Sequence, residues 1–183
     1  MRWTNLVDDL DKVLRKVRPA VIVALHPDLD SHRDHQFTTV ALAQALSRRN
    51  RRVTLLLYTN HADQNRYPYG PAGTLMSLPP PVPRGMILDG VYSHAVSPEL
   101  QRLKLFALEA MHDLRVAPSR LYQLVIGDDR TREPEKSGPA ATGGVAYLRR
   151  GPRSNELFYV YDQDTVRPMI EAFLVAWRTR PTP

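Results

Sequence analysis

Two short apolar runs, separated by one helical pattern, constrain the fold of this chain most strongly. They are Ala20 to Leu25, which reads Ala-Val-Ile-Val-Ala-Leu, and Val53 to Tyr58, which reads Val-Thr-Leu-Leu-Leu-Tyr. Short continuous runs rich in β-branched residues are typical of strands buried on both faces, as in a parallel sheet. Between them, apolar residues recur in a helical pattern as far as Leu46. Strand, helix and strand in this order predict a right-handed βαβ crossover and an α/β protein.

The rest of the chain predicts further helices and short strands around two long loops. Apolar periodicity predicts helices over residues 4–18, from Pro98 to about Arg115, and over 165–177, with strand candidates within 84–91, at 147–148 and at 157–161. The Pro-rich region 60–98 and the polar region 127–144 predict loops. The length of 183 residues suits one well-cored domain, and no boundary is evident, so residues 1–183 are expected to form a single domain.

Composition narrows the classes of function. The chain contains no cysteine, so any metal must be held by His and carboxylate ligands. Its net charge is +6, but the basic clusters at residues 48–52 and 149–153 accompany no nucleic-acid motif and are expected to be solvated, so we expect no nucleic-acid partner. No apolar run approaches the roughly 18 residues that span a bilayer, and the N-terminus has no signal-peptide core. We therefore expect no membrane association and a cytoplasmic location.

The segment from His26 to His35, HPDLDSHRDH, carries the densest concentration of reactive side chains. It follows a predicted buried strand and opens a helix, which is where ligands bind in open α/β folds. His32 and His35 are three residues apart, so on the first turn of a helix they project to the same side. Asp34 lies between them and could accept a hydrogen bond from an imidazole N–H, as carboxylates next to zinc-binding histidines do. A pair of solvated or capping histidines, with Asp30 or Ser31 as the N-cap, is the alternative.

Four stretches in order resemble the PIG-L/LmbE family of zinc-dependent N-deacetylases. The first, RPAVIVALHPDLDSHRDHQFTTVALAQAL, resembles the family's second signature, a strand followed by a His-x-Asp-His motif that opens a helix. The others are LLLYTNHADQNRYPYGPAGT, LQRLKLFALEAMHDLR and RRGPRSNELFYVYD. The resemblance covers nearly the whole chain but only the downstream portion of the family pattern. It implies a Rossmann-like, mostly parallel sheet with flanking helices, lacking its first βα portion.

The resemblance also implies a chemistry. His35 would be a zinc ligand, His32 would face the substrate and stabilise the oxyanion or act as acid, and Asp34 would orient one of them. The reaction would be hydrolysis of an N-acetyl group, on a small amino-sugar-type substrate. Zinc would polarise the amide carbonyl and lower the pKa of its bound water to about 7.

The family's first signature, a His-Pro-Asp-Asp turn with two more zinc ligands and the general base, is absent. His26-Pro27-Asp28 imitates it, but Leu29 stands where the ligating Asp is expected, so we interpret it as the lead-in to the second motif. The chain alone is therefore expected to be inactive, and its expected partner is a missing N-terminal fragment or a second copy in a homo-oligomer. A homodimer is not expected to complete the site, because neither copy carries the missing carboxylates. A non-catalytic homologue that binds a sugar or a partner is the alternative function.

Several other residues are weaker candidates. His61 and His94 could line a sugar pocket, although a loop histidine with a local hydrogen bond is the simpler interpretation, and His112 could be a buried or a pocket residue. Tyr67 and Tyr69 could stack on a sugar ring, although core packing is favoured. Asn155 and Glu156 could brace the site or form a structural turn, and Asp28 and Asp30 could bind a metal adventitiously.

Overall fold

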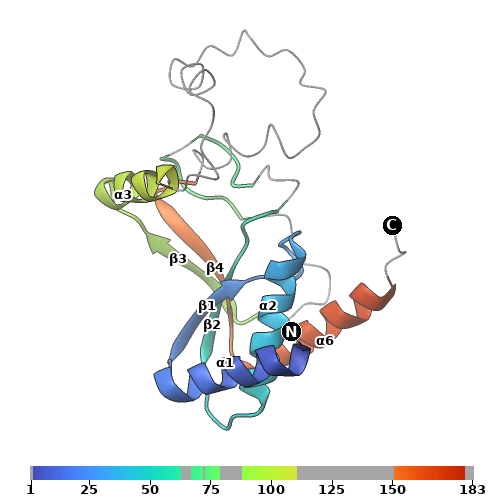
Figure 1. Ribbon diagram of the computed structural model, residues 1–183. Helices are drawn as coiled ribbons and strands as arrows, with labels where there is room; N and C mark the ends of the chain where they lie inside the picture. The colour runs from blue at the N-terminus through green and yellow to red at the C-terminus, as the bar shows by residue number, and fades with distance from the viewer. Residues whose placement is uncertain (1, 63–66, 72, 79–87, 111–150, 180–183) are drawn as a thin grey trace. The chain divides into compact units, whose positions relative to one another are not determined.

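A computed structural model describes residues 2–62, 67–71, 73–78, 88–110 and 151–179 of the chain. Within them lie four helices and four strands (Figure 1). In chain order they are α1 (Trp3–Val17), β1 (Val21–Leu25), α2 (Arg33–Ser47), β2 (Thr54–Tyr58), β3 (Gly90–Ala95), α3 (Pro98–Glu109), β4 (Asn155–Tyr161) and α6 (Gln163–Thr179). The helices and strands expected around residues 4–58 and at the C-terminus are confirmed. The strand candidate at 147–148, the loop at 127–144 and His112 lie outside the described residues.

Contacts divide the chain into two compact units, which are described separately. The first comprises residues 1–63, 78–94 and 157–183, and the second comprises residues 64–77 and 95–156. In the described part of the chain, no helix combines the length and the apolar character that crossing a bilayer requires.

The four strands form one open, mixed sheet with the order β1-β2-β4-β3. β1 and β2 are parallel, with Val21 opposite Thr54 and Leu25 opposite Tyr58, as expected for a strand-helix-strand unit. β2 and β4 are antiparallel, with Leu56 opposite Val160. The fold is therefore mixed α/β, and the expectation of a mostly parallel sheet is wrong. An apolar run indicates burial, which both ladder types provide, and it carries no information about strand direction.

The core of the first unit lies between the sheet and three helices. Alternate strand residues enter it, so Leu55 and Leu57 of β2 are fully buried whereas Leu56 and Tyr58 are half-buried. The helices α1, α2 and α6 supply the rest of the same apolar cluster, including Val7, Leu14, Val40, Leu46, Ile170 and Phe173. Because side chains alternate along a strand, the core lies on one face of the sheet. β1 was expected to be buried on both faces, and this is wrong: it is an edge strand whose Val21 and Val23 are 51% and 56% exposed.

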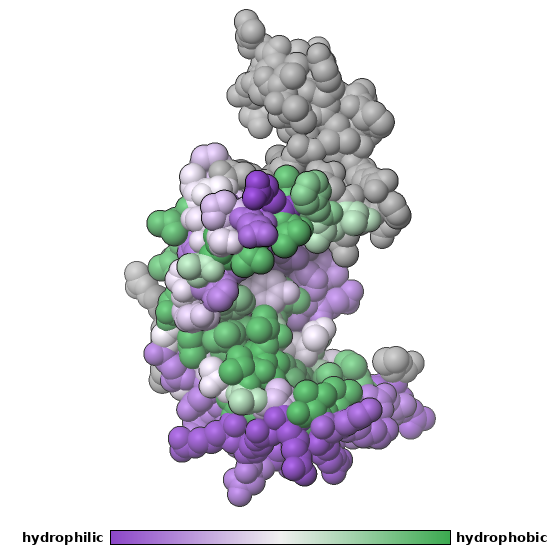
Figure 2. All heavy atoms as spheres, turned by 90° about the vertical axis from the view of Figure 1, so that its left-hand side faces the viewer, coloured by the Kyte–Doolittle hydropathy of each residue, from purple (hydrophilic) through white to green (hydrophobic). Residues whose placement is uncertain are grey.

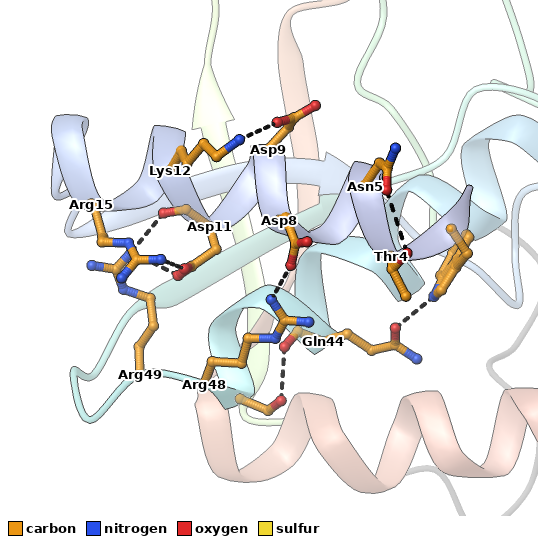
Figure 3. Close-up of polar contacts among 12 residues, drawn as sticks. Thr4, Asn5, Asp8, Asp9, Asp11, Lys12, Arg15, Gln44, Arg48 and Arg49 are labelled. Atoms are coloured by element: carbon orange, nitrogen blue, oxygen red, sulfur yellow. Dashed lines mark hydrogen bonds and ion pairs between the residues drawn. The ribbon is translucent and has the colours of Figure 1, made fainter. Parts of the chain in front are cut away.

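Ion pairs and hydrogen bonds of charged side chains link α1 to the C-terminal end of α2 (Figure 3). Arg48 donates to Asp8 at 2.7 Å, and Arg49 donates to the carbonyl and the carboxylate of Asp11 at 3.0 and 3.3 Å. Asp11 is buried and also accepts from Arg15 within α1. An open pocket of about 560 Å³ lies beside these groups. The basic cluster that begins at Arg48 is thus largely engaged in contacts between elements.

The second unit is organised around the buried guanidinium of Arg153. It donates to the carbonyl oxygens of Pro68, Gly70 and Pro71 at 3.0, 2.7 and 2.5 Å and to the Thr74 hydroxyl at 2.7 Å. These bonds hold a turn in which Gly70 adopts a φ of 82°, a conformation that favours glycine.

The helix of the second unit begins as the sequence predicts. The side chain of Ser97 caps α3 by accepting from the Leu100 amide, and Pro98 occupies the first helical turn. Lys104 of this helix forms an ion pair with Glu156. Asn155 accepts a hydrogen bond from the Met76 amide, so both members of the Asn155-Glu156 pair have structural partners.

Candidate functional site

The candidate site is built from two loops that follow neighbouring parallel strands. One loop leaves β1 at His26, and the other leaves β2 after Tyr58. The His26 amide donates to the Tyr58 carbonyl at 2.6 Å, which extends the ladder by one bond beyond β1. Because the carboxyl ends of parallel strands meet at one edge, the two loops lie side by side. Ser31 strengthens this contact, since its amide and its hydroxyl both donate to the His61 carbonyl, at 3.0 and 2.7 Å.

Asp30 joins the two loops through its buried carboxylate. Its side chain is inaccessible to solvent. One carboxylate oxygen accepts from the His32 amide at 2.9 Å and from the His35 ring at 3.0 Å. The other accepts from the amides of Asn60 and His61, at 2.8 and 3.1 Å. Both oxygens are therefore satisfied, which is the condition for burying a carboxylate at low cost.

Three imidazole rings lie close together beside this carboxylate. His32 is the N-cap residue of α2, and His35 lies in the first turn of the helix. Their ring centroids are 4.7 Å apart. The ring of His61, from the loop after β2, lies 5.1 Å from His35 in a stacked orientation and 5.7 Å from His32. The described residues therefore form a cluster of three histidines at the strand ends.

The hydrogen bond to Asp30 fixes the orientation and the tautomer of His35. An ionised carboxylate only accepts, so the proton of a neutral His35 ring lies on Nδ1, the atom 3.0 Å from Asp30. Nε2 then carries a lone pair, and the ring is a quarter exposed. Histidines that bind zinc in proteins commonly donate one ring N–H to a carboxylate in this way, while the other ring nitrogen binds the metal. His35 is thus prepared to act as a ligand or an acceptor.

His26 is a buried structural histidine. Its side chain is fully buried, its Nδ1 accepts from the Asp28 amide at 3.3 Å, and its Nε2 lies 3.0 Å from the Tyr161 hydroxyl. Burial lowers the pKa of His26 to about 4, although the charge of Asp30 opposes this shift, so the ring is neutral at pH 7. Burial likewise raises the pKa of Tyr161.

The predicted site residues are partly brought together. His32 and His35 are adjacent, as predicted from their spacing. The Asp34 side chain is 90% exposed and lies 4.0 Å from the His32 ring, so Asp30, and not Asp34, makes the hydrogen bond that orients an imidazole. His61, which the sequence favoured as an ordinary loop histidine, joins the cluster. The only sequence signal for it was its place three residues after a predicted parallel strand.

The other candidates have local contacts. His94 is exposed and its ring lies 3.0 Å from the Tyr92 hydroxyl. Tyr67 is buried and packs edge-on against Tyr69 at 5.7 Å, which confirms core packing for Tyr67. Tyr69 is 37% exposed.

The side chains of this cluster are of the types that bind zinc, but too few of them are placed to bind one ion. Imidazole and carboxylate groups are proper zinc ligands, and a zinc site requires three or four of them. Across the described residues, no three His, Asp or Glu side chains are arranged to hold one ion together. Asp30 already receives four hydrogen-bond donors. His35 therefore fits the part of one ligand, and the described residues do not form a complete zinc site.

No protein-family model, no characterised protein and no solved structure compared with the chain matches it.

Proposed function

We propose that the chain contributes the downstream part of a zinc-dependent N-deacetylase of the PIG-L/LmbE type, acting on N-acetylated amino sugars or similar amides. The main support is the hydrogen bond between Asp30 and the His35 ring, which leaves Nε2 of His35 available to a metal at the carboxyl edge of a parallel strand pair. The order of the four family-like stretches supports the same assignment. In this proposal, further ligands come from outside the described residues.

Each residue of the cluster has a distinct part in this proposal. His35 offers Nε2 as a ligand, and Asp30 holds its ring and both loops in place. His32 is half exposed beside it, so its ring can donate a hydrogen bond to the oxygen of a substrate amide as negative charge develops there. His61 extends the imidazole surface next to His35. The zinc ion, when bound, would supply Lewis-acid polarisation of the amide.

The sharpest test is to titrate zinc into the protein while ring nitrogens are observed by long-range ¹H–¹⁵N NMR. We expect His35 to carry its proton on Nδ1 before titration, and its Nε2 resonance to shift on addition of zinc, with weak affinity. The variant His35→Ala should lose most of this binding. The matched control His94→Ala, which removes an exposed ring outside the cluster, should leave it unchanged. Equal zinc binding by wild type and His35→Ala would contradict the assignment.

An activity assay addresses the completeness of the site. We expect the chain alone to release acetate from N-acetylglucosaminides at background rate. One tightly held zinc ion per chain together with amidase activity would refute the view that the site needs further ligands. If the chain is instead a non-catalytic sugar-binding module, we expect it to bind N-acetylglucosamine in the presence of a chelator. We also expect this binding to remain when His32 and His35 are both replaced by Ala.

A further inference from the structure

The outer edge of β1 is the edge that faces away from β2. β1 is the first strand of the sheet order and pairs with β2 on one side. Ala20 and His26 make ladder bonds to β2, at 3.0 Å to the Thr54 amide and at 2.6 Å to the Tyr58 carbonyl. Backbone groups alternate in direction along a strand, so the odd-numbered residues direct theirs toward the outer edge. In the described part of the chain, no strand pairs with that edge.

Among the described residues, β1 carries neither the charges nor the bulge that often prevent strand addition at a sheet edge. Natural edge strands are also limited by short length and by proline, and β1 is five residues long and lies between Pro19 and Pro27, which restrict pairing to its central part. Val21–Leu25 contains no charge, and Val21 and Val23 are 51% and 56% exposed. Figure 2, turned toward the side on which β1 is drawn in Figure 1, shows apolar surface bordered by a hydrophilic band. An apolar, exposed edge of this kind is suited to pairing with another strand.

Two prolines limit where such pairing can occur. Pro19 and Pro27 occupy the odd-numbered positions directly outside Val21 and Leu25. Proline has no N–H, so neither can donate across the outer edge. The outward donors are thus confined to Val21, Val23 and Leu25, a set that is symmetric about Val23. The Leu25 carbonyl already accepts from Thr39 at 2.6 Å, but its N–H points outward and a carbonyl has a second lone pair.

We propose that a second copy of this chain pairs antiparallel with β1 along this edge, with the two-fold axis passing between the two Val23 residues. In this register Val21 lies opposite Leu25 of the other copy, Val23 lies opposite Val23, and each Pro19 lies opposite Pro27. Every outward N–H therefore meets a carbonyl of the other copy. A two-fold interface needs a surface that complements itself, and a donor set that is symmetric about its centre meets that condition.

Charge supports the antiparallel direction and the choice of a second copy. The chain enters β1 through Lys16 and Arg18, both exposed, and the exposed Asp34 lies beyond its exit, at the start of α2. Antiparallel pairing of two copies brings the basic entry of each strand near the acidic exit of the other. Parallel pairing of two copies would instead place like charges together. Arg33 at the same exit is held over the Trp177 ring, 5.3 Å from its centroid.

The oligomeric state in solution, measured by light scattering over a concentration series, tests the proposal. We expect the mass of two chains for the wild type and of one chain for Val23→Lys, because a charge on the edge opposes strand addition. The matched control Val175→Lys places the same charge on an exposed valine of α6, which is 60% exposed, and should remain a dimer. A monomeric wild type would overturn the proposal, and this result is expected if the edge pairs with a strand of a different polypeptide. A Val23→Lys variant that dimerises like the wild type would also overturn it.

A cysteine variant tests the register in a protein whose fold is otherwise intact. The chain has no cysteine, so Val23→Cys introduces a single thiol per copy. Hydrogen-bonded antiparallel neighbours have Cα atoms about 5.5 Å apart, within the range that a disulfide spans. We expect oxidation to link two Val23→Cys chains covalently and to leave Val21→Cys chains unlinked, since Val21 faces Leu25. The reverse pattern would overturn the register. These outcomes are independent of zinc binding.

Discussion

Because the imidazole of His26 is buried and neutral, we predict that acid lowers the free energy of unfolding of this protein. In the folded chain the pKa of His26 is lowered from 6.5 to about 4, because burial penalises the charged ring. In the unfolded chain the ring is hydrated and takes up its proton near pH 6.5. Between these two values the unfolded state binds more protons than the folded state. The free energy of unfolding must therefore fall as the pH falls through this window, whereas well above pH 6.5 proton binding by His26 no longer changes it.

The magnitude follows from the two pKa values. At 1.36 kcal/mol for each pKa unit, a fall from 6.5 to about 4 corresponds to about 3 kcal/mol in full. Integration of proton uptake gives about 2 kcal/mol of that loss between pH 7.5 and pH 5. Because other groups also titrate there, the measurement compares urea unfolding of wild type and His26→Gln at both pH values by circular dichroism. The glutamine stays neutral and can still donate to Tyr161.

We expect the variant to be less stable at pH 7.5 but to lose about 2 kcal/mol less than the wild type on going to pH 5. The control His94→Gln replaces an exposed histidine and should lose as much as the wild type. If His26→Gln and the wild type lost equal stability over this range, the buried neutral ring would not be a source of acid sensitivity.

Two further predictions concern buried polar groups. Asp30→Asn should lower the free energy of unfolding by about 3 kcal/mol in urea titrations, because an amide NH₂ would face backbone donors. Asp34→Asn, on an exposed side chain, should change it by less than about 0.5 kcal/mol, and equal effects would contradict the role given to Asp30. Arg153→Lys should cost about 3 kcal/mol, since one ammonium cannot reach the oxygens that the guanidinium spans. Arg102→Lys, on the exposed side of α3, is its control, and a melting temperature unchanged by both would refute the prediction.

The helices and strands of the first unit could be predicted because each carries its own periodic signal. The apolar stripe that predicted a helix over residues 4–18 buries Val7 and Leu14 in α1, and Arg18 ends the helix in the left-handed conformation just before Pro19. The β-branched runs became β1 and β2 within one residue of their expected bounds. Such signals are local, since spacing along the chain determines which residues share a face.

Strand direction and edge position could not be predicted because they depend on partners far away in the sequence. β4 pairs with β2 across about a hundred residues, and nothing in the run that forms β4 indicates an antiparallel ladder. The exposure of Val21 and Val23 has the same origin. Their sequence is that of an inner strand, and only the sheet order places them at an edge.

The choice between Asp30 and Asp34 shows why spacing alone is insufficient at the site. Asp34 lies between His32 and His35 in the sequence, but on a helix a neighbouring residue points about 100° away, and its side chain is solvated. Asp30 precedes the helix, and its amide donates to the His26 carbonyl at 3.0 Å, which folds the loop back and carries its carboxylate under the cluster. Sequence could predict that a carboxylate orients an imidazole here, but the loop conformation determines which one.

The histidine cluster and the parallel strand pair depend on the same bonds, and this affects how the site can be tested. Leu25 lies opposite Tyr58, so the loops after β1 and β2 begin at the same level of the sheet. Because of this register, Asp30 can accept hydrogen bonds from the amides of Asn60 and His61. A change at Asp30 therefore weakens the sheet and the site together, and loss of function in Asp30→Asn would not distinguish them. His35 is different, because its ring is partly exposed and its hydrogen bond is made to Asp30 of its own loop. A His35 variant that retains wild-type stability but loses zinc binding would separate the chemistry of the site from the stability of the fold.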